Sequence, residues 1–161
     1  MRTISLWQPW ATAIAIGLKS IETRHWCPKY RGPLAIHAAR RWDSSQKEFA
    51  MVERGLGRLP ARLPFGAVIA VCDLVDVRPA AELVLSIKPI EKLYGNYTAG
   101  RFGWLLENVV ELSEPVPFKG HQSFFDVPDD LLPLTAGQQY DNRAKYGHFG
   151  QGSGDGDLFG S

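Results

Sequence analysis

Three charged residues capable of binding chemistry lie close together in residues 17–24: Lys19, Glu22 and Arg24. The guanidinium of Arg24 offers a planar fork for a phosphate or for the edge of a nucleobase, and the ammonium of Lys19 is a compact charge. Glu22 can orient either cation or accept a hydrogen bond from a base. If residues 19–24 run extended, Glu22 and Arg24 share one face. The spacing predicts a compact binding site, and an exposed strip of ion pairs is the ordinary alternative.

Aromatic residues are concentrated in the same part of the chain. Besides Tyr30, four of the five tryptophans precede residue 43: Trp7, Trp10, Trp26 and Trp42. Aromatic faces beside cations hold unstacked nucleobases, and each stack contributes about 1–3 kcal/mol. We expect Trp26 and Trp7 to line a groove, and Trp10 and Trp104 to pack in the core.

Further candidates for ligand contact are spread along the chain: Gln8, Thr23, His37, Tyr97, Arg101 and Lys119. His37 is predicted on a strand, where it is a candidate ligand contact or proton carrier, with a hydrogen-bonded structural histidine as the alternative. Residues 96–102 combine Tyr97 and Arg101 beside a glycine, which is typical of a loop that closes over a groove. Lys119 is a candidate contact at the rim.

Charge is distributed unevenly along the chain, although the net charge is only +1. Residues 1–62 hold eleven Lys and Arg against four acids, a difference of +7, and residues 63–161 hold seven against thirteen, a difference of −6. A basic half suits a polyanionic or phosphate-bearing partner. In the alternative arrangement, the two halves interleave in space and their charges cancel.

The two cysteines, Cys27 and Cys72, form no CxxC pair and no cluster with zinc spacing, so we expect no metal and no cofactor. Cys72 lies in an apolar run typical of the core. A disulfide stays open, but two lone cysteines favour a reducing cytoplasm. No signal peptide or apolar stretch of membrane length is present, and these features predict a cytoplasmic protein that has no membrane contact.

Hydrophobic patterning predicts a mixed α/β domain centred on a small β-barrel, closed or nearly closed, with flanking helices. Strands are expected at residues 3–6, 34–38, 67–77 and 103–112, with a separate edge-like segment at 115–118, and residues 123–127 end the ordered core. Helices are expected at 8–17 and from 43, the latter with a capping box of Ser45 and Glu48, and residues 79–94 are helical or irregular. Residues 1–133 form the predicted domain, and the glycine-rich residues 134–161 form a flexible tail.

Several segments together resemble the ASCH domain family. They are Leu6-Trp7-Gln8-Pro9-Trp10-Ala11, Gly17-Leu18-Lys19-Ser20-Ile21-Glu22-Thr23-Arg24 and Arg31-Gly32-Pro33-Leu34-Ala35-Ile36-His37-Ala38. The resemblance covers roughly residues 2–133 and is strongest to the branch found in a thyroid-receptor-interacting transcription coactivator. It implies a PUA-like β-barrel with a cleft beside the first helix, and a role in RNA or other nucleic-acid biology. The segment that lies in the cleft of family members corresponds here to Gly17, Lys19, Glu22 and Arg24.

The leading hypothesis is a module that binds RNA, DNA or a nucleotide-like ligand through a basic, aromatic-lined cleft. In it Lys19, Arg24 and Lys119 hold phosphate, Glu22 orients Arg24 or contacts a base edge, and the stacking residues are Trp26, Tyr97 and Trp7. Such binding weakens with salt. A monomer is favoured.

A small hydrolase is the rival hypothesis. Some small members of the resembling family hydrolyse acetylated cytidine with a Lys, a Thr and a Glu, and ribonuclease activity also occurs. Lys19 matches that Lys and would be the activated catalytic group, with Glu22 or His37 handling protons. Glu22 occupies the place of the Thr, however, and the catalytic Glu has no clear match. A protein-interaction module is the third and weaker alternative.

Overall fold

The computed structural model describes residues 1–133, so the predicted tail at 134–161 lies outside the described residues. The described strands form one sheet in the order β2-β5-β4-β3-β1-β6, in which β1 and β3 run parallel and the other neighbours antiparallel. The strands are β1 (Arg2–Leu6), β2 (Ile21–Arg24), β3 (Gly32–Ala38), β4 (Ala67–Pro79), β5 (Phe102–Pro117) and β6 (Phe124–Asp126). The helices are α1 (Trp10–Ala15), α2 (Ser44–Gly55), α3 (Ala80–Leu83), α4 (Pro89–Tyr94) and the 3-10 turn η1 (Asp129–Leu131).

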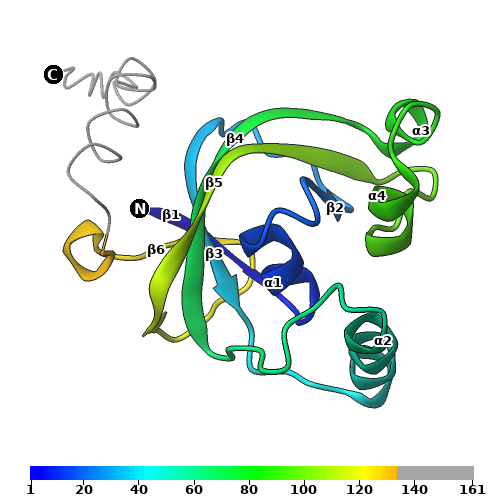
Figure 1. Cartoon of the computed structure of the whole chain (residues 1–161). Helices are drawn as coiled ribbons and strands as arrows, with labels where there is room; N and C mark the ends of the chain where they lie inside the picture. Colours follow the sequence, from blue (N-terminus) through cyan, green and yellow to red (C-terminus); the bar gives the residue numbers. More distant parts are fainter. Residues whose placement is uncertain (134–161) are drawn as a thin grey trace, which may run out of the picture.

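The sheet curls into an open half-barrel, which confirms the predicted mixed α/β, barrel-centred class (Figure 1). The curl follows from irregular pairing of the two longest strands. The register of β4 against β5 shifts at three places, between Val68 and Ala70, between Val71 and Asp73, and between Leu74 and Asp76. Because such irregularities bend a strand and increase its twist, β4 and β5 arch over the rest of the domain.

Helix α1 fills the concave face of the curled sheet (Figure 1). Its buried residues Ala11, Ile14 and Ala15 belong to the main core, together with apolar residues of β1, β3, β4 and β5. Small alanine side chains let the helix lie close to the strands. Trp104 of β5 is fully buried in this core, as predicted for that tryptophan.

The two edge strands, β2 and β6, are connected by aromatic side chains instead of a backbone ladder. Trp26, just after β2, makes an edge-to-face contact with Phe124 of β6 at 5.1 Å between ring centroids. Tyr30 contacts the same ring at 5.7 Å, and the indole nitrogen of Trp104 donates to the carbonyl of Trp26 at 3.2 Å. The half-barrel is therefore closed at this point by side-chain packing alone.

Two local predictions were wrong. Residues 115–118 are not a separate segment, because β5 continues to Pro117 and pairs there with the start of β4. Proline is tolerated because β2 pairs only with the first part of β5, which leaves this stretch at the sheet edge. The capping box of α2 consists of Asp43 and Gln46, whose side chains and backbone bond reciprocally, and not of Ser45 and Glu48.

Both cysteines are free, Cys72 in the core and Cys27 exposed. Residues 1–133 contain no group of three or more His, Cys, Asp or Glu side chains arranged to ligate a metal ion. None of the helices in this part of the chain has the length and apolar character that a bilayer crossing requires.

A buried carboxylate attaches α4 to the beginning of β2. Glu91 accepts hydrogen bonds from the backbone N–H of Ser20 at 2.6 Å, from its hydroxyl at 2.7 Å and from the N–H of Ile21 at 3.3 Å. Tyr94 of the same helix donates to Glu53 of α2 at 2.7 Å. The position of β2 therefore depends on polar contacts from the helical side.

We expect Glu91→Ala to lower the free energy of unfolding by about 2–4 kcal/mol, because it removes the acceptor of the Ser20 donors and of the buried N–H of Ile21. Urea denaturation measures this loss. The matched control is Glu111→Ala, which removes an exposed carboxylate of β5 and should change stability by less than about 0.5 kcal/mol. Equal effects of the two substitutions would contradict the role given to Glu91.

Candidate functional site

The turn after α1 directs Lys19 into the protein. Gly17 has a φ of +78°, a conformation that glycine adopts without strain, and the N–H groups of Leu18 and Lys19 both donate to the carbonyl of Ala13, at 2.9 and 3.0 Å. The chain thus reverses tightly and enters β2 with Lys19 beneath the strand. Its side chain is completely buried.

Glu22 lies between the two cations predicted to accompany it. The Glu22 carboxylate is 3.6 Å from Lys19 Nζ and 4.0 Å from Arg24 Nη1. Lys19 also donates to the carbonyl of Ile21. The exposed fractions of the three side chains are 0% for Lys19, 12% for Glu22 and 26% for Arg24. Of these three side chains, only Glu22 and Arg24 are therefore exposed enough to contact a ligand. The influence of Lys19 is limited to its positive charge.

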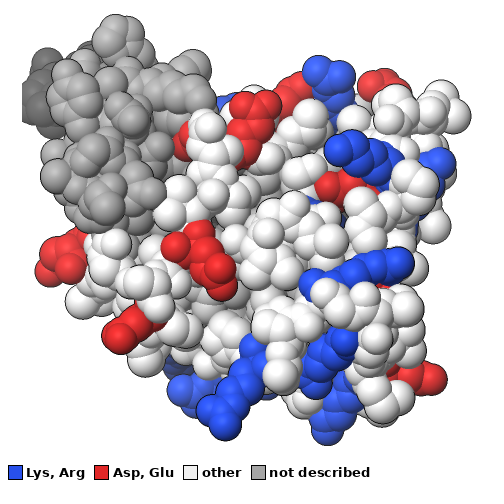
Figure 2. Space-filling view, in the orientation of Figure 1, with Lys and Arg blue, Asp and Glu red and all other residues white. Residues whose placement is uncertain are grey.

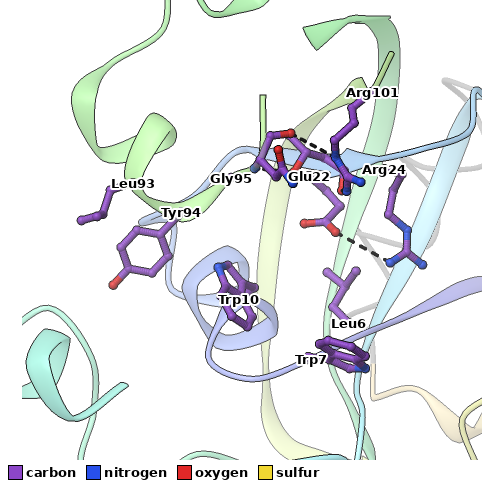
Figure 3. Close-up of a pocket in the computed structure, with 11 residues that line it drawn as sticks. Leu6, Trp7, Trp10, Glu22, Arg24, Leu93, Tyr94, Gly95 and Arg101 are labelled. Atoms are coloured by element: carbon purple, nitrogen blue, oxygen red, sulfur yellow. Dashed lines mark hydrogen bonds and ion pairs between the residues drawn. The ribbon is translucent and has the colours of Figure 1, made fainter. Parts of the chain in front are cut away.

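The first hollow lies between β2, α1 and the end of α4, and it has a cavity volume of about 440 Å³. Figure 3 shows Glu22 and Arg24 pointing toward each other above Trp7, with Trp10, Leu93 and Tyr94 on the opposite side. Its lining is Leu6, Trp7, Trp10, Glu22, Thr23, Arg24, Leu93, Tyr94, Gly95, Asn96 and Arg101. Apolar walls with a carboxylate and guanidinium groups suit a flat, polar-edged ligand.

Thr23 and Arg101 attach the loop after α4 to β2. The Thr23 hydroxyl accepts from the N–H of Asn96 at 2.9 Å, and the Thr23 carbonyl accepts from Arg101 Nη2 at 3.0 Å. Arg101 Nε also donates to the carbonyl of Asn96 at 3.2 Å. Both predicted site residues thus line the hollow and shape its wall.

A second hollow, of about 670 Å³, adjoins the first and shares Trp7 and Arg24 with it. It lies between the end of β2 and the loop that precedes β6. The lining is Ser5, Trp7, Arg24, His25, Trp26, His121, Gln122 and Ser123. Trp7 is 45% exposed, and the guanidinium of Arg41 lies over its ring at 4.4 Å. The two hollows therefore meet at one exposed indole and one arginine.

Two buried polar atoms beside the first hollow have no hydrogen-bond partner among the described residues: Arg24 Nε and Tyr97 Oη. Burial raises the pKa of the Tyr97 phenol, and the nearby charges of Glu91 and Glu22 raise it further. Tyr97 packs so close to the chain that a side chain at Gly95 would meet its ring. Buried donors without partners are rare in native proteins, and both of these belong to or adjoin the wall of the first hollow.

Besides Lys19 and Tyr97, three predicted contact residues line neither hollow. Gln8 is buried, donates to Thr12 and Pro64 and accepts from Thr12, so its amide holds the start of α1. His37 is buried, with both ring nitrogens in hydrogen bonds. Lys119 is exposed and lines neither hollow.

Several lining residues were not predicted from the sequence. Trp10, assigned to the core, both stacks on Phe49 of α2 and lines the first hollow. The unpredicted polar residues of the second hollow are Ser5, His25 and residues 121–123, and Ser5 meets residues 121–123 because β6 pairs with β1. His121 and Gln122 follow closely after Lys119, the predicted rim contact. This proximity is the one feature of the sequence that could have indicated them as lining residues.

Charged side chains are partly segregated on the surface. Figure 2 shows Lys and Arg gathered over the lower and right-hand parts of one face, on the side where α2 lies in Figure 1. Asp and Glu lie mostly along the left and upper margins of that face. The uneven charge of the sequence is therefore still visible on the folded molecule.

The curled sheet, the helix on its concave face and the groove beside β2 define a known class of domain. The chain belongs to the ASCH domain family, whose model matches residues 4–116. Mouse activating signal cointegrator 1 is 28% identical over 137 residues, and the human protein of that name is 26% identical over 137 residues. Both matches cover 80% of this chain but only 22% of the relative.

Solved structures agree on the fold. The crystal structure of ASCH from Zymomonas mobilis superposes with a TM-score of 0.52 at 18% identity, covering 81% of this chain and 89% of that one. A substituted form of the same protein gives a TM-score of 0.52 at 19% identity, with coverages of 87% and 95%.

We expect Lys19→Met to lower the free energy of unfolding by about 3 kcal/mol, because it leaves Glu22 without the charge beneath it. The double variant Lys19→Met/Glu22→Gln should lose less than the sum of the two single changes, by about 1–3 kcal/mol. Urea denaturation of the four proteins measures this coupling. Lys47→Met, an exposed lysine of α2, serves as the control, and additive losses would show that the pair is not coupled.

Proposed function

We propose that the two adjoining hollows form one groove that binds RNA, single-stranded DNA or a nucleotide-like ligand. The observation that carries this proposal is that Arg24, with a buried unpartnered Nε, and the exposed ring of Trp7 line both hollows. A ligand that extends from one hollow into the other must pass a cation and an aromatic face. Single-stranded nucleic acid carries phosphates and flat bases in that alternation.

Arg24 and Glu22 are the polar contacts of the proposed groove. The Arg24 guanidinium, 26% exposed, can donate to a phosphate or to the acceptor edge of a base. Glu22 is 12% exposed and acceptor-only when ionised, so it can accept from an exocyclic amino group of a base. Lys19 supports both by holding the Glu22 carboxylate from beneath.

Trp7 is the proposed stacking platform. Arg41 covers one face of its ring, and a base can stack on the opposite face. Trp26 contributes the wall of the second hollow, where its ring is already held edge-to-face by Trp104 and Phe124. Tyr97, predicted to stack, lines neither hollow and has no direct contact with the ligand in this proposal.

Family membership supports the same conclusion at a coarse level, because ASCH domains are in general related to RNA binding. The chain spans about a fifth of the length of the curated relatives that it matches. The proposal is therefore restricted to what this domain binds. The monomeric state and the cytoplasmic location stay predictions.

The rival role as a hydrolase with Lys19 as the activated group has less support. The Lys19 side chain is fully buried, and its ammonium already contacts the Ile21 carbonyl and the Glu22 carboxylate. A substrate in either hollow would not touch it. The binding role needs no such contact.

The proposal is tested by fluorescence anisotropy with labelled single-stranded RNA and with DNA of the same sequence. We expect Arg24→Ala and Trp7→Ala each to weaken binding about tenfold or more, because they remove a charged hydrogen bond or a stack. With about three phosphate contacts, raising the salt from about 50 to 200 mM should weaken binding by roughly an order of magnitude.

Arg78→Ala is the matched control, since Arg78 is an exposed arginine that lines neither hollow. It should leave the affinity almost unchanged. An affinity for RNA, DNA and nucleotides that Arg24→Ala, Trp7→Ala and salt all leave unchanged would remove the proposed groove from consideration.

A further inference from the structure

A serine and a histidine lie side by side at the base of the second hollow. Strands β1 and β3 pair in parallel with Ser5 directly opposite His37. Their side chains therefore project from the same face of the sheet, and Ser5 Oγ is 2.8 Å from His37 Nδ1. This is the distance at which an imidazole takes the proton of an attacking hydroxyl.

The second nitrogen of His37 fixes which way the proton lies. His37 Nε2 is 2.9 Å from the carbonyl oxygen of Phe118, which can only accept a hydrogen bond. Nε2 therefore carries the ring proton, and Nδ1 accepts from the Ser5 hydroxyl. Burial lowers the pKa of His37, and Arg40 and His121 lower it further against the opposing bond to Phe118, which favours the neutral ring with Nδ1 free to accept a proton.

The loop before β6 leaves space for this pair only because it carries a glycine. A Cβ atom at Gly120 would lie 2.6 Å from His37 Cε1 and 2.7 Å from Ser5 Oγ, closer than real Cβ atoms approach such neighbours. Gly120 is therefore required for the observed contact between Ser5 and His37. Gly120 therefore has a positioning role. The Phe118 carbonyl that contacts His37 belongs to the same loop.

Ser5 is also accessible to a substrate. It is half-buried and lines the hollow of about 670 Å³, whereas His37 behind it is only 1% exposed. The same hollow is lined by side chains that can donate to a developing oxyanion: Arg24, His25, His121 and Gln122. A nucleophile and several polar donors thus line one cavity. The base lies directly behind the nucleophile, together with the carbonyl that orients it.

We propose that Ser5 and His37 form a catalytic pair that hydrolyses carboxylic esters. Ser5 Oγ attacks the carbonyl carbon while its proton passes to His37 Nδ1, and a bond forms between Oγ and that carbon. The bond to the alcohol oxygen then breaks, and this oxygen leaves with the proton from His37. Water, deprotonated by the same nitrogen, attacks the acyl-serine, releases the acid and restores Ser5.

The pair is tested directly by its reactivity with a fluorophosphonate probe, in which an activated serine displaces fluoride from phosphorus. The full chain is incubated with the probe, digested and analysed by mass spectrometry. We expect one phosphonyl group on the peptide that contains Ser5, and none on Ser5→Ala. A burst of p-nitrophenol from p-nitrophenyl acetate, equal to one per chain, should accompany it.

Two variants separate catalysis from structure. His37→Gln removes the base and should slow labelling about 100-fold or more, the usual contribution of a general base. Ser113→Ala removes an exposed serine of β5 that lines neither hollow, and it should leave labelling unchanged. Circular dichroism verifies that each variant is folded, and the result on the unaltered protein stands even if His37→Gln does not fold.

Labelling of Ser5 at the rate of the exposed Ser113, or no labelling of the folded unaltered protein, would overturn the proposal and leave His37 a structural histidine. The test is independent of the proposed nucleic-acid groove, because neither the probe nor the ester contains a phosphate chain or a base.

Discussion

The buried ammonium of Lys19 is the constraint on which the groove depends. A charge removed from water is tolerated only where it has an opposite charge and hydrogen-bond acceptors close by. Glu22 and the Ile21 carbonyl supply these, and both belong to β2. The requirement therefore fixes the strand against the turn at Gly17. It also holds the Glu22 carboxylate at the groove surface, from where it reaches Arg24.

The openness of the sheet determines where the ligand-accessible space lies. Register shifts in the pairing of β4 with β5 bend the sheet, but β2 and β6 stop short of pairing. The second hollow occupies that gap, and the first lies on the other side of Trp7 and Arg24. Trp26 and Phe124 close the remainder of the gap and form one wall. If β2 and β6 paired and closed the barrel, the second hollow between them would be lost.

Local patterning explains how much of this could be predicted from the sequence. The β-branched run of β4, the alternation of β1 and the glycine at position 17 are local signals, and the elements that they predict are present. The burial of Lys19 is not a local property, because it depends on how α1 and β2 meet. The pairing of Ser5 with His37 requires β1 and β3 to be parallel neighbours, which no short pattern indicates. The residues around Gly120 join the site only through the return of β6.

A sheet that ends in two unpaired edges presents backbone groups to which a strand of another chain could add, and this is a common route to aggregation. In this domain β2 has four residues and β6 has three. Glu22 and Arg24 occupy half of the positions of β2 and are paired with each other. Beyond β2 the edge continues along β5, where Pro115 and Pro117 lack the N–H groups with which a foreign strand would pair. The fold can therefore leave its barrel open while exposing little backbone that a foreign strand could extend.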